Sequence, residues 1–340
     1  MPRSRIAEVR LEAIAAAKTL HREMGLKSRV QSGEGFIDVF GIIEDLGIPL
    51  VFQPLNSALG LCLPRPNRGI MITTQRSLHI QRFTGAHELG HDTLEHSGSI
   101  DSVINFRAGL DPGEGQDLQE VAADTFAAEF MLPRWLYKHH IQKQQWTVSR
   151  HLNNPDIIYQ LSLRMAASFE ATCWGLVSHD IVSRNAAQEL LKSKVANLKS
   201  DAGQQFRPAN AWANAWRLSA HDDGDVVLGD SDDLVRLDLD EAAGSGYQWS
   251  VEALTEAGFK VLSDQNDIPR DPMNYGATAR RTIMLRPPER PSALLALAER
   301  RPWLDPGPDD RALCVHLRLN GKEKGGLAHG SLFRPGANTQ

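Results

Sequence analysis

The stretch FTGAHELGHDTLEH, residues 83–96, contains three histidines and two glutamates, and it is the most informative part of the first half of the chain. Its apolar positions recur at helical spacing, so the stretch is expected to form one helix. His87 and His91 then lie one turn apart on the same face, where two imidazoles can bind one metal ion. Glu88 is rotated by about 100° from His87, which suits a general base beside that ion rather than a ligand.

The third metal ligand decides the subclass of such a site. His96 stands five residues after the second histidine, whereas the three-histidine pattern requires six and a glycine where this chain has leucine. In the stretch LQEVAADTFAAEFMLP, residues 118–133, Glu120 and Asp124 share one face of a predicted helix that ends before proline. From the residues alone, Glu120 is either the third ligand or a solvated carboxylate. Asp124 is a candidate to hold the N–H of a ligand imidazole.

The donor set predicts both the ion and the chemistry. Zn²⁺ accepts two imidazoles and a carboxylate, and it lowers the pKa of a bound water toward neutrality. With Glu88 as base, such a site hydrolyses an amide and passes a proton to the leaving amine. The transition state also needs a stabilising donor, for which His96 and Tyr137 are unranked candidates. Cys62 is a candidate inhibitory ligand, since thiolates bind zinc strongly; its alternative role is a small buried hydrophobe.

Length and composition limit the class of protein. The chain has 340 residues, of which 41% are hydrophobic and 23% charged, enough for two globular domains. It contains no apolar run long enough to span a membrane, and its first residues lack the apolar core of a secretory signal. Three widely separated cysteines predict a reducing compartment, so we expect a cytoplasmic protein with no membrane partner.

The hydrophobic pattern changes from helical to alternating near residues 200–220. Before this boundary we expect a helix and a strand within 36–52, a hairpin within 60–74 and three helices within 155–191, with breaks near Ser168 and Ser178. After it we expect strands at DVVL (225–228), LVRLDLD (234–240), YQWSVEAL (247–254), FKVLS (259–263), RRTIML (280–285) and ALCVHLRL (312–319). The pattern predicts an α+β fold with one domain at 1–205 and an all-β domain at 217–335.

Residues 36–135 closely resemble the ImmA/IrrE metallopeptidases, through DVFGIIEDLGIPLVF (38–52), the histidine stretch and EVAADTFAAEFMLP (120–133). The resemblance implies a zincin-like, mainly helical domain with a small sheet. It also implies that the zinc ligands are His87, His91 and Glu120, with Glu88 as the base. Asp124 stands where the family often has asparagine, which can also orient a ligand. The segment at about 155–195 is similar to the helix-turn-helix-like subdomain that follows in this family; packing on the peptidase is its alternative role.

The second half resembles the chagasin-type inhibitors of cysteine peptidases. The loop segments EAAGSGYQW (241–249), NYGATARR (274–281) and RRPWLDP (300–306) are similar, in order, to three loops that cluster at one end of that family's immunoglobulin-like sandwich. The first lacks the family's Asn-Pro, and the second has fewer glycines. Candidate ligand-binding residues are Tyr247, Trp249, Arg301 and Trp303, although aromatic residues of β domains are commonly core or turn residues.

These observations predict a regulated zinc endopeptidase. The ImmA/IrrE resemblance implies cleavage of a helix-turn-helix repressor in transcription regulation during a stress, DNA-damage or anti-phage response. The second domain is expected to sense a signal or dock a partner. Single-stranded DNA is a candidate activator because aromatic residues lie near arginines in the loop segments, although nine acidic residues between Asp222 and Glu241 oppose a large nucleic-acid surface. The alternative is a non-catalytic zinc-binding regulator or a cysteine-peptidase inhibitor that acts by binding alone.

Overall fold

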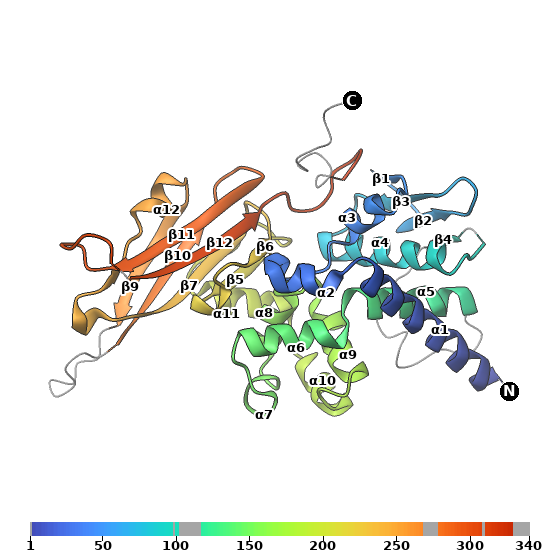
Figure 1. The fold of residues 1–340 in the computed structure, drawn as a ribbon, viewed down its shortest axis with the longest axis horizontal. Coiled ribbons are helices and arrows are strands. Elements are labelled where there is room, and N and C mark those ends of the chain that lie inside the picture. Colours follow the sequence, from blue (N-terminus) through green and yellow to red (C-terminus); the bar gives the residue numbers. More distant parts are fainter. Residues whose placement is uncertain (1, 98, 102–116, 268–277, 308–309, 329–340) are drawn as a thin grey trace. The chain divides into compact units, whose positions relative to one another are not determined.

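The computed structural model describes residues 2–97, 99–101, 117–267, 278–307 and 310–328 (Figure 1). These residues form two compact units. Unit 1 contains the described residues within 2–142, 146–192 and 322–328, and unit 2 contains those within 143–145 and 193–321. The sequence places the boundary at 205–217, but the structure places it near 192, because helix α11 (Val195–Gly203) packs on the strands of unit 2.

Unit 1 combines helices with one small sheet. Its helices are α1 (Pro2–Glu23), α2 (Leu26–Arg29), the π-helical turn η1 (Val30–Glu34), α3 (Val39–Asp45), α4 (Leu78–Thr93), α5 (Leu118–Met131), α6 (Arg134–Lys143, whose last residue falls in unit 2), α7 (Val148–His151), α8 (Pro155–Arg164), α9 (Phe169–Ser178) and α10 (Arg184–Leu190). Its strands are β1 (Leu50–Gln53), β2 (Gly60–Leu63), β3 (Gly69–Thr73) and β4 (Ser99–Asp101).

The sheet of unit 1 supports helix α4. Its strand order is β1-β3-β2-β4, with β1 parallel to β3 and the other pairs antiparallel. Helix α4 packs against β2 and β3 and also against α5, so nearly all of its second half is buried. Helix α5 packs in turn against α1. The predicted helix–strand segment, hairpin and histidine helix are confirmed.

Local capping explains where the helices begin and end. The side chain of Asp117 accepts from Gln119 N at the start of α5, which ends at Met131, two residues before a proline. Asn154 caps α8, and Ser168 caps α9 by accepting from Ala171 N. The three helices expected within 155–191 are confirmed, with the predicted breaks at the start and end of α9.

The segment Lys322–Ala328 returns to unit 1 after the strands of unit 2, and we call it the strap. Phe52 of β1 and Gly326 exchange two backbone hydrogen bonds of 2.9 Å, which covers the outer edge of β1. The fully buried side chain of Gln81, on α4, donates to Glu323 O and accepts from Glu323 N, both at 2.9 Å. Unit 1 is therefore completed by residues that follow unit 2 in the chain.

Unit 2 contains two four-stranded sheets. One has the order β5-β7-β10-β9 and the other β6-β12-β11-β8, and only β5–β7 and β6–β12 are parallel among the described pairs. The elements are β5 (Ala215–Leu218), η2 (Ala220–Asp222), β6 (Val226–Leu228), β7 (Leu234–Glu241), η3 (Ala243–Ser245), β8 (Gln248–Trp249), α12 (Glu252–Glu256), β9 (Lys260–Asp267), β10 (Ala279–Arg286), β11 (Ser292–Arg300) and β12 (Arg311–Arg318). The immunoglobulin-like packing of these sheets stays a prediction.

Three details of unit 2 differ from the sequence prediction, and the first is strand β5, which lies before the first expected strand. The segment 247–254 is not one strand, because β8 ends at Trp249 and residues 252–256 form α12. Strand β11 was not predicted, since its alanines and leucines are typical of a helix, yet Ala293, Leu295 and Leu297 alternate into the core. None of the helices described here is both long enough and apolar enough to cross a membrane.

Close packing between α6 and α9 yields a stability prediction. A Cβ at Gly175 would lie 2.1 Å from the hydroxyl of Tyr137, which is fully buried and donates to Thr172 O at 3.0 Å. Gly175→Ala should therefore lower the free energy of unfolding by about 1–3 kcal/mol in urea titrations. In a Tyr137→Phe background the same substitution should cost less, because the nearest atom is gone. An equal cost in both backgrounds would contradict this explanation.

Candidate metal centre

Helix α4 carries three of the predicted site residues into the interior of unit 1. His87, Glu88 and His91 are 3%, 0% and 1% exposed, because the sheet covers one side of the helix and α5 another. Both histidines lie on the face toward α5, as their spacing predicts. Burial of the Glu88 carboxylate is unfavourable unless a cation or a proton compensates its charge.

Helix α5 brings two carboxylates to these histidines. Glu120 lies in its first turn, with Oε2 3.3 Å from Nε2 of His87 and Oε1 3.5 Å from Nε2 of His91. The two Nε2 atoms are 3.1 Å apart. Ligands placed about 2.0–2.1 Å from a tetrahedral ion are about 3.3–3.4 Å from one another. The three donor atoms thus have the spacing of a ligand set, and the group can hold a metal ion.

The second ring nitrogen of each histidine also has a partner. Oδ1 of Asp124 lies 2.9 Å from Nδ1 of His87, and Nδ1 of His96 lies 3.0 Å from Nδ1 of His91. Both ligand rings are thereby oriented with Nε2 toward Glu120. Burial lowers the pKa of His96, which favours the neutral imidazole. Within the described residues, His96 is not a member of the three-residue group that could hold a metal.

Glu88 also packs against strand β2. A Cβ at Gly60 would lie 2.1 Å from Oε1 of Glu88 and 2.5 Å from Cγ2 of Thr84, so the strand backbone passes directly over the carboxylate. Only glycine leaves room for Glu88 in this arrangement. The sequence predicts that Glu88 is a base and not a ligand. In agreement, its carboxylate is not among the donor atoms that are grouped for metal binding.

The other predicted site residues of unit 1 lie elsewhere. Cys62 is 3% exposed on β2, its sulfur is 3.8 Å from Leu63 O, and it does not belong to the metal-binding group among the described residues. Tyr137 lies in the α6–α9 interface, where burial raises the pKa of its phenol well above the usual value. The roles assigned to Cys62, Tyr137 and His96 stay predictions.

In unit 2, the predicted residues divide between core and surface. Trp249 is 2% exposed and donates to Asp240 O, whereas Trp303 is 67% exposed. The guanidinium of Arg301 lies 4.7 Å from the centre of the Tyr247 ring and donates to Ser245 O. Residues 274–277 of the second loop segment lie outside the described residues.

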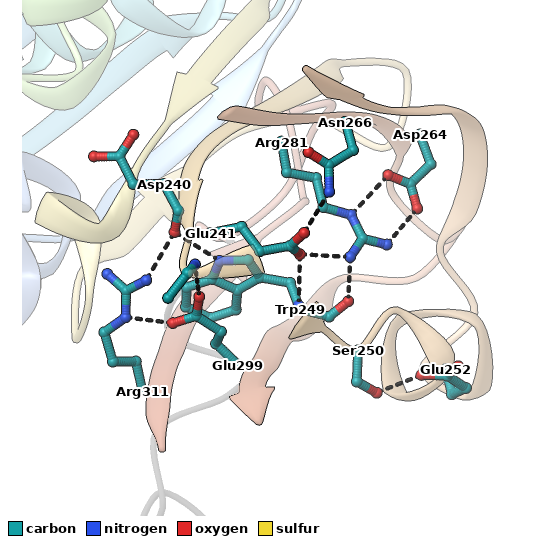
Figure 2. A network of polar contacts seen from close by, with 11 residues as sticks. Asp240, Glu241, Trp249, Ser250, Glu252, Asp264, Asn266, Arg281, Glu299 and Arg311 are labelled. Carbon is teal, nitrogen blue, oxygen red and sulfur yellow. Dashed lines mark hydrogen bonds and ion pairs between the residues drawn. The ribbon is translucent and has the colours of Figure 1, made fainter. Parts of the chain in front are cut away.

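Buried carboxylates hold the segment before Trp249 in place (Figure 2). Glu241 accepts from Trp249 N at 2.9 Å, from Arg281 Nη1 at 2.8 Å and from Asn266, and Glu299 accepts from Ala242 N at 2.7 Å and from Arg311. Hydrogen bonds to Asp264 and Glu241 raise the pKa of Arg281, so this cation stays charged. The first loop segment is therefore anchored at both ends by buried carboxylates, each of which also pairs with an arginine.

Comparison with known proteins agrees with the site. Residues 43–176 match the model of the peptidase M78 family described as the IrrE N-terminal-like domain. This match confirms the ImmA/IrrE resemblance over that part of the chain, which contains all of the metal-binding group, and it supports a metallopeptidase-type function. Among curated proteins, no match was found.

Two solved structures are similar to the C-terminal region. One is a cysteine protease inhibitor from Entamoeba histolytica, with 21% identity, a TM-score of 0.26, and coverage of 30% of this chain and 93% of that one. The other is amebosin in solution, with 18% identity, a TM-score of 0.25, and coverage of 30% and 95%.

Two features of the centre were not predicted from the sequence. The lack of a side chain at Gly60 could not be linked to Glu88 without knowing that β2 crosses α4. The contact of His96 with His91 depends on how the chain turns after α4. The turn of the β2–β3 hairpin is also joined to helix α4. Arg68 in this turn forms a bidentate ion pair with Asp92, the residue after His91.

The donor geometry predicts the metal content of variants. Glu120→Ala, His87→Ala and His91→Ala should each reduce bound metal from about one equivalent per chain to a small fraction, because each removes one of three protein ligands. Elemental analysis after dialysis measures this. Glu23→Ala, an exposed acid at the end of α1, is the control and should keep full content. Full content in Glu120→Ala would show that the third ligand is a different residue.

Proposed function

We propose that the protein is a zinc-dependent endopeptidase of the cytoplasm. The observation that carries the proposal is the grouping of His87, His91 and Glu120 at ligand spacing, with the separate carboxylate of Glu88 one residue after the first histidine. Two imidazoles and one carboxylate form a catalytic zinc set that leaves a position for water or substrate. A purely structural zinc site needs four protein ligands and has no use for a neighbouring base.

Within this site, Glu88 is the group that moves protons. Zinc, when bound, supplies a Lewis acid that polarises the scissile carbonyl and favours ionisation of water. Glu88 takes a proton from the attacking water and delivers it to the leaving amine nitrogen. Its complete burial keeps bulk water from competing for that proton. Asp124 holds the ring of His87 through Nδ1, so that Nε2 keeps its direction.

We propose a helix-turn-helix repressor as the substrate, cleaved in a regulated response to stress, DNA damage or phage. The support is the ImmA/IrrE resemblance, together with the family match over the catalytic helices. A peptidase of this kind needs a recognition surface outside the catalytic residues, because the base and ligands do not distinguish one peptide from another.

We propose that unit 2 supplies part of that surface and docks a protein partner. Trp303 and Leu304 are 67% and 53% exposed. The Trp303 ring lies against Gly246, where a Cβ would be 2.6 Å away, so the loops fix the ring while leaving it accessible. A rigid, exposed tryptophan beside the paired Arg301 and Tyr247 is typical of an anchor for a partner with an acidic face.

The catalytic assignment is tested by Glu88→Gln. The variant should keep its zinc, yet cleavage of the helix-turn-helix repressor proposed as substrate should fall about 10²–10⁴-fold, because an amide cannot accept the proton. Glu23→Gln is the control and should cleave like the unmodified protein. Normal cleavage by Glu88→Gln would exclude it as the base. If the zinc-loaded protein binds the repressor but leaves it intact, the non-catalytic regulator is the correct function.

The docking assignment is tested by Trp303→Ala. Affinity for the repressor should fall about tenfold or more, the loss expected for an interface anchor. Cleavage of a short peptide should not change. Trp212→Ala removes another exposed tryptophan of unit 2 and should bind normally. A point substitution is preferable to truncation at 217, which would also remove the strap from unit 1. Equal binding by both variants refutes docking at these loops, and salt-sensitive stimulation by single-stranded DNA would favour the nucleic-acid activator.

A further inference from the structure

The chain turns back on itself directly after α4. Glu95 has φ 54°, in the left-handed region, and its N–H donates to Asp92 O at 3.3 Å, while His96 N donates to His91 O at 3.0 Å. These are the two hydrogen bonds of a Schellman motif. Helix α3 ends in the same way, but with Gly47 at φ 68° as the left-handed residue. At α4 a glutamate adopts this less favourable conformation.

The turn places the ring of His96 against the ring of His91. The ring centres are 5.0 Å apart at an interplanar angle of 71°, and the two Nδ1 atoms are 3.0 Å apart. Nε2 of His91 faces the other ligands, 3.1 Å from Nε2 of His87 and 3.5 Å from Oε1 of Glu120. If Nε2 carries the lone pair for the metal, the proton of His91 is on Nδ1. Nδ1 of His96 must then accept that proton's hydrogen bond.

We propose that His96 is the positioning residue of His91, whose ring it holds for metal binding as Asp124 holds that of His87. The inference rests on the metal site proposed above. This role explains why His96 is not itself a ligand, because its Nδ1 already contacts the imidazole of the ligand His91. It also gives the two ligands different supports, a carboxylate for His87 and an imidazole for His91. The imidazole of His96 orients His91 without adding a further negative charge to a site that already contains three carboxylates.

The experiment measures metal affinity rather than activity. Zinc affinity of the full chain is determined by competition with a chromogenic chelator, and the Co²⁺-loaded protein is examined by visible absorption. His96→Ala should bind zinc about 10–100-fold more weakly, as expected for loss of a ligand's hydrogen-bond partner. Its cobalt spectrum should change, because the His91 ring is no longer fixed. His316→Ala, at an exposed position of β12, is the control and should match the unmodified protein.

Two replacements at the same position distinguish positioning from packing. His96→Asn places an amide oxygen close to where Nδ1 lies and should restore most of the zinc affinity. His96→Gln places its amide nearer the position of Nε2 and should resemble His96→Ala. Equal affinity in the unmodified protein and His96→Ala overturns the inference. Equal weakening in all three variants also overturns it, since an acceptor at the position of Nδ1 would then have no effect. Failure of the unmodified protein to bind zinc would instead refute the proposed function.

Discussion

The close approach of α4 and α5 is the contact on which the metal centre depends. A Cβ at Gly90 would lie 3.2 Å from Cα of Ala123 and 3.1 Å from a ring carbon of Phe126, so the helices meet almost backbone to backbone. The same contact brings Glu120 to within 3.5 Å of both histidines. The ligand geometry is therefore set by small residues that bind nothing, and by the sheet and α1 that press the two helices together.

The sequence predicted what is local and missed what depends on distant contacts. Helices α4 and α5 were predictable because their apolar spacing and their caps agree. Strand β11 was not, because alanine and leucine favour a helix and only its neighbours β8 and β12 make it a strand. The strap was missed because no local pattern links Glu323 to Gln81, 242 residues earlier. The position of His96 was missed because a left-handed Glu95 is uncommon.

Both units bury acidic groups, but they compensate the charge differently. In unit 2, Glu241 and Glu299 each accept a backbone N–H and each pair with an arginine, so the charges are balanced within the protein (Figure 2). In unit 1, Glu88, Glu120 and Asp124 gather around two histidines. The negative charge of these three carboxylates is best compensated by a cation from solution. A binding centre differs in this way from a structural network, whose charges are compensated by the protein's own side chains.

The strap has a consequence for how the protein is made. A ribosome releases the chain from its N-terminus onward, and most domains fold as soon as their last residue emerges. Unit 1 is still incomplete when residue 192 has been made, because the partners of Gln81 and Phe52 are Glu323 and Gly326, which are synthesised after all of unit 2. Until then the outer edge of β1 stays open and α4 lacks one of its buried contacts. A growing chain thus carries α4 and α5 for most of its synthesis without a finished domain around them, and unit 1 is complete only once the residues of unit 2 and the strap have been made.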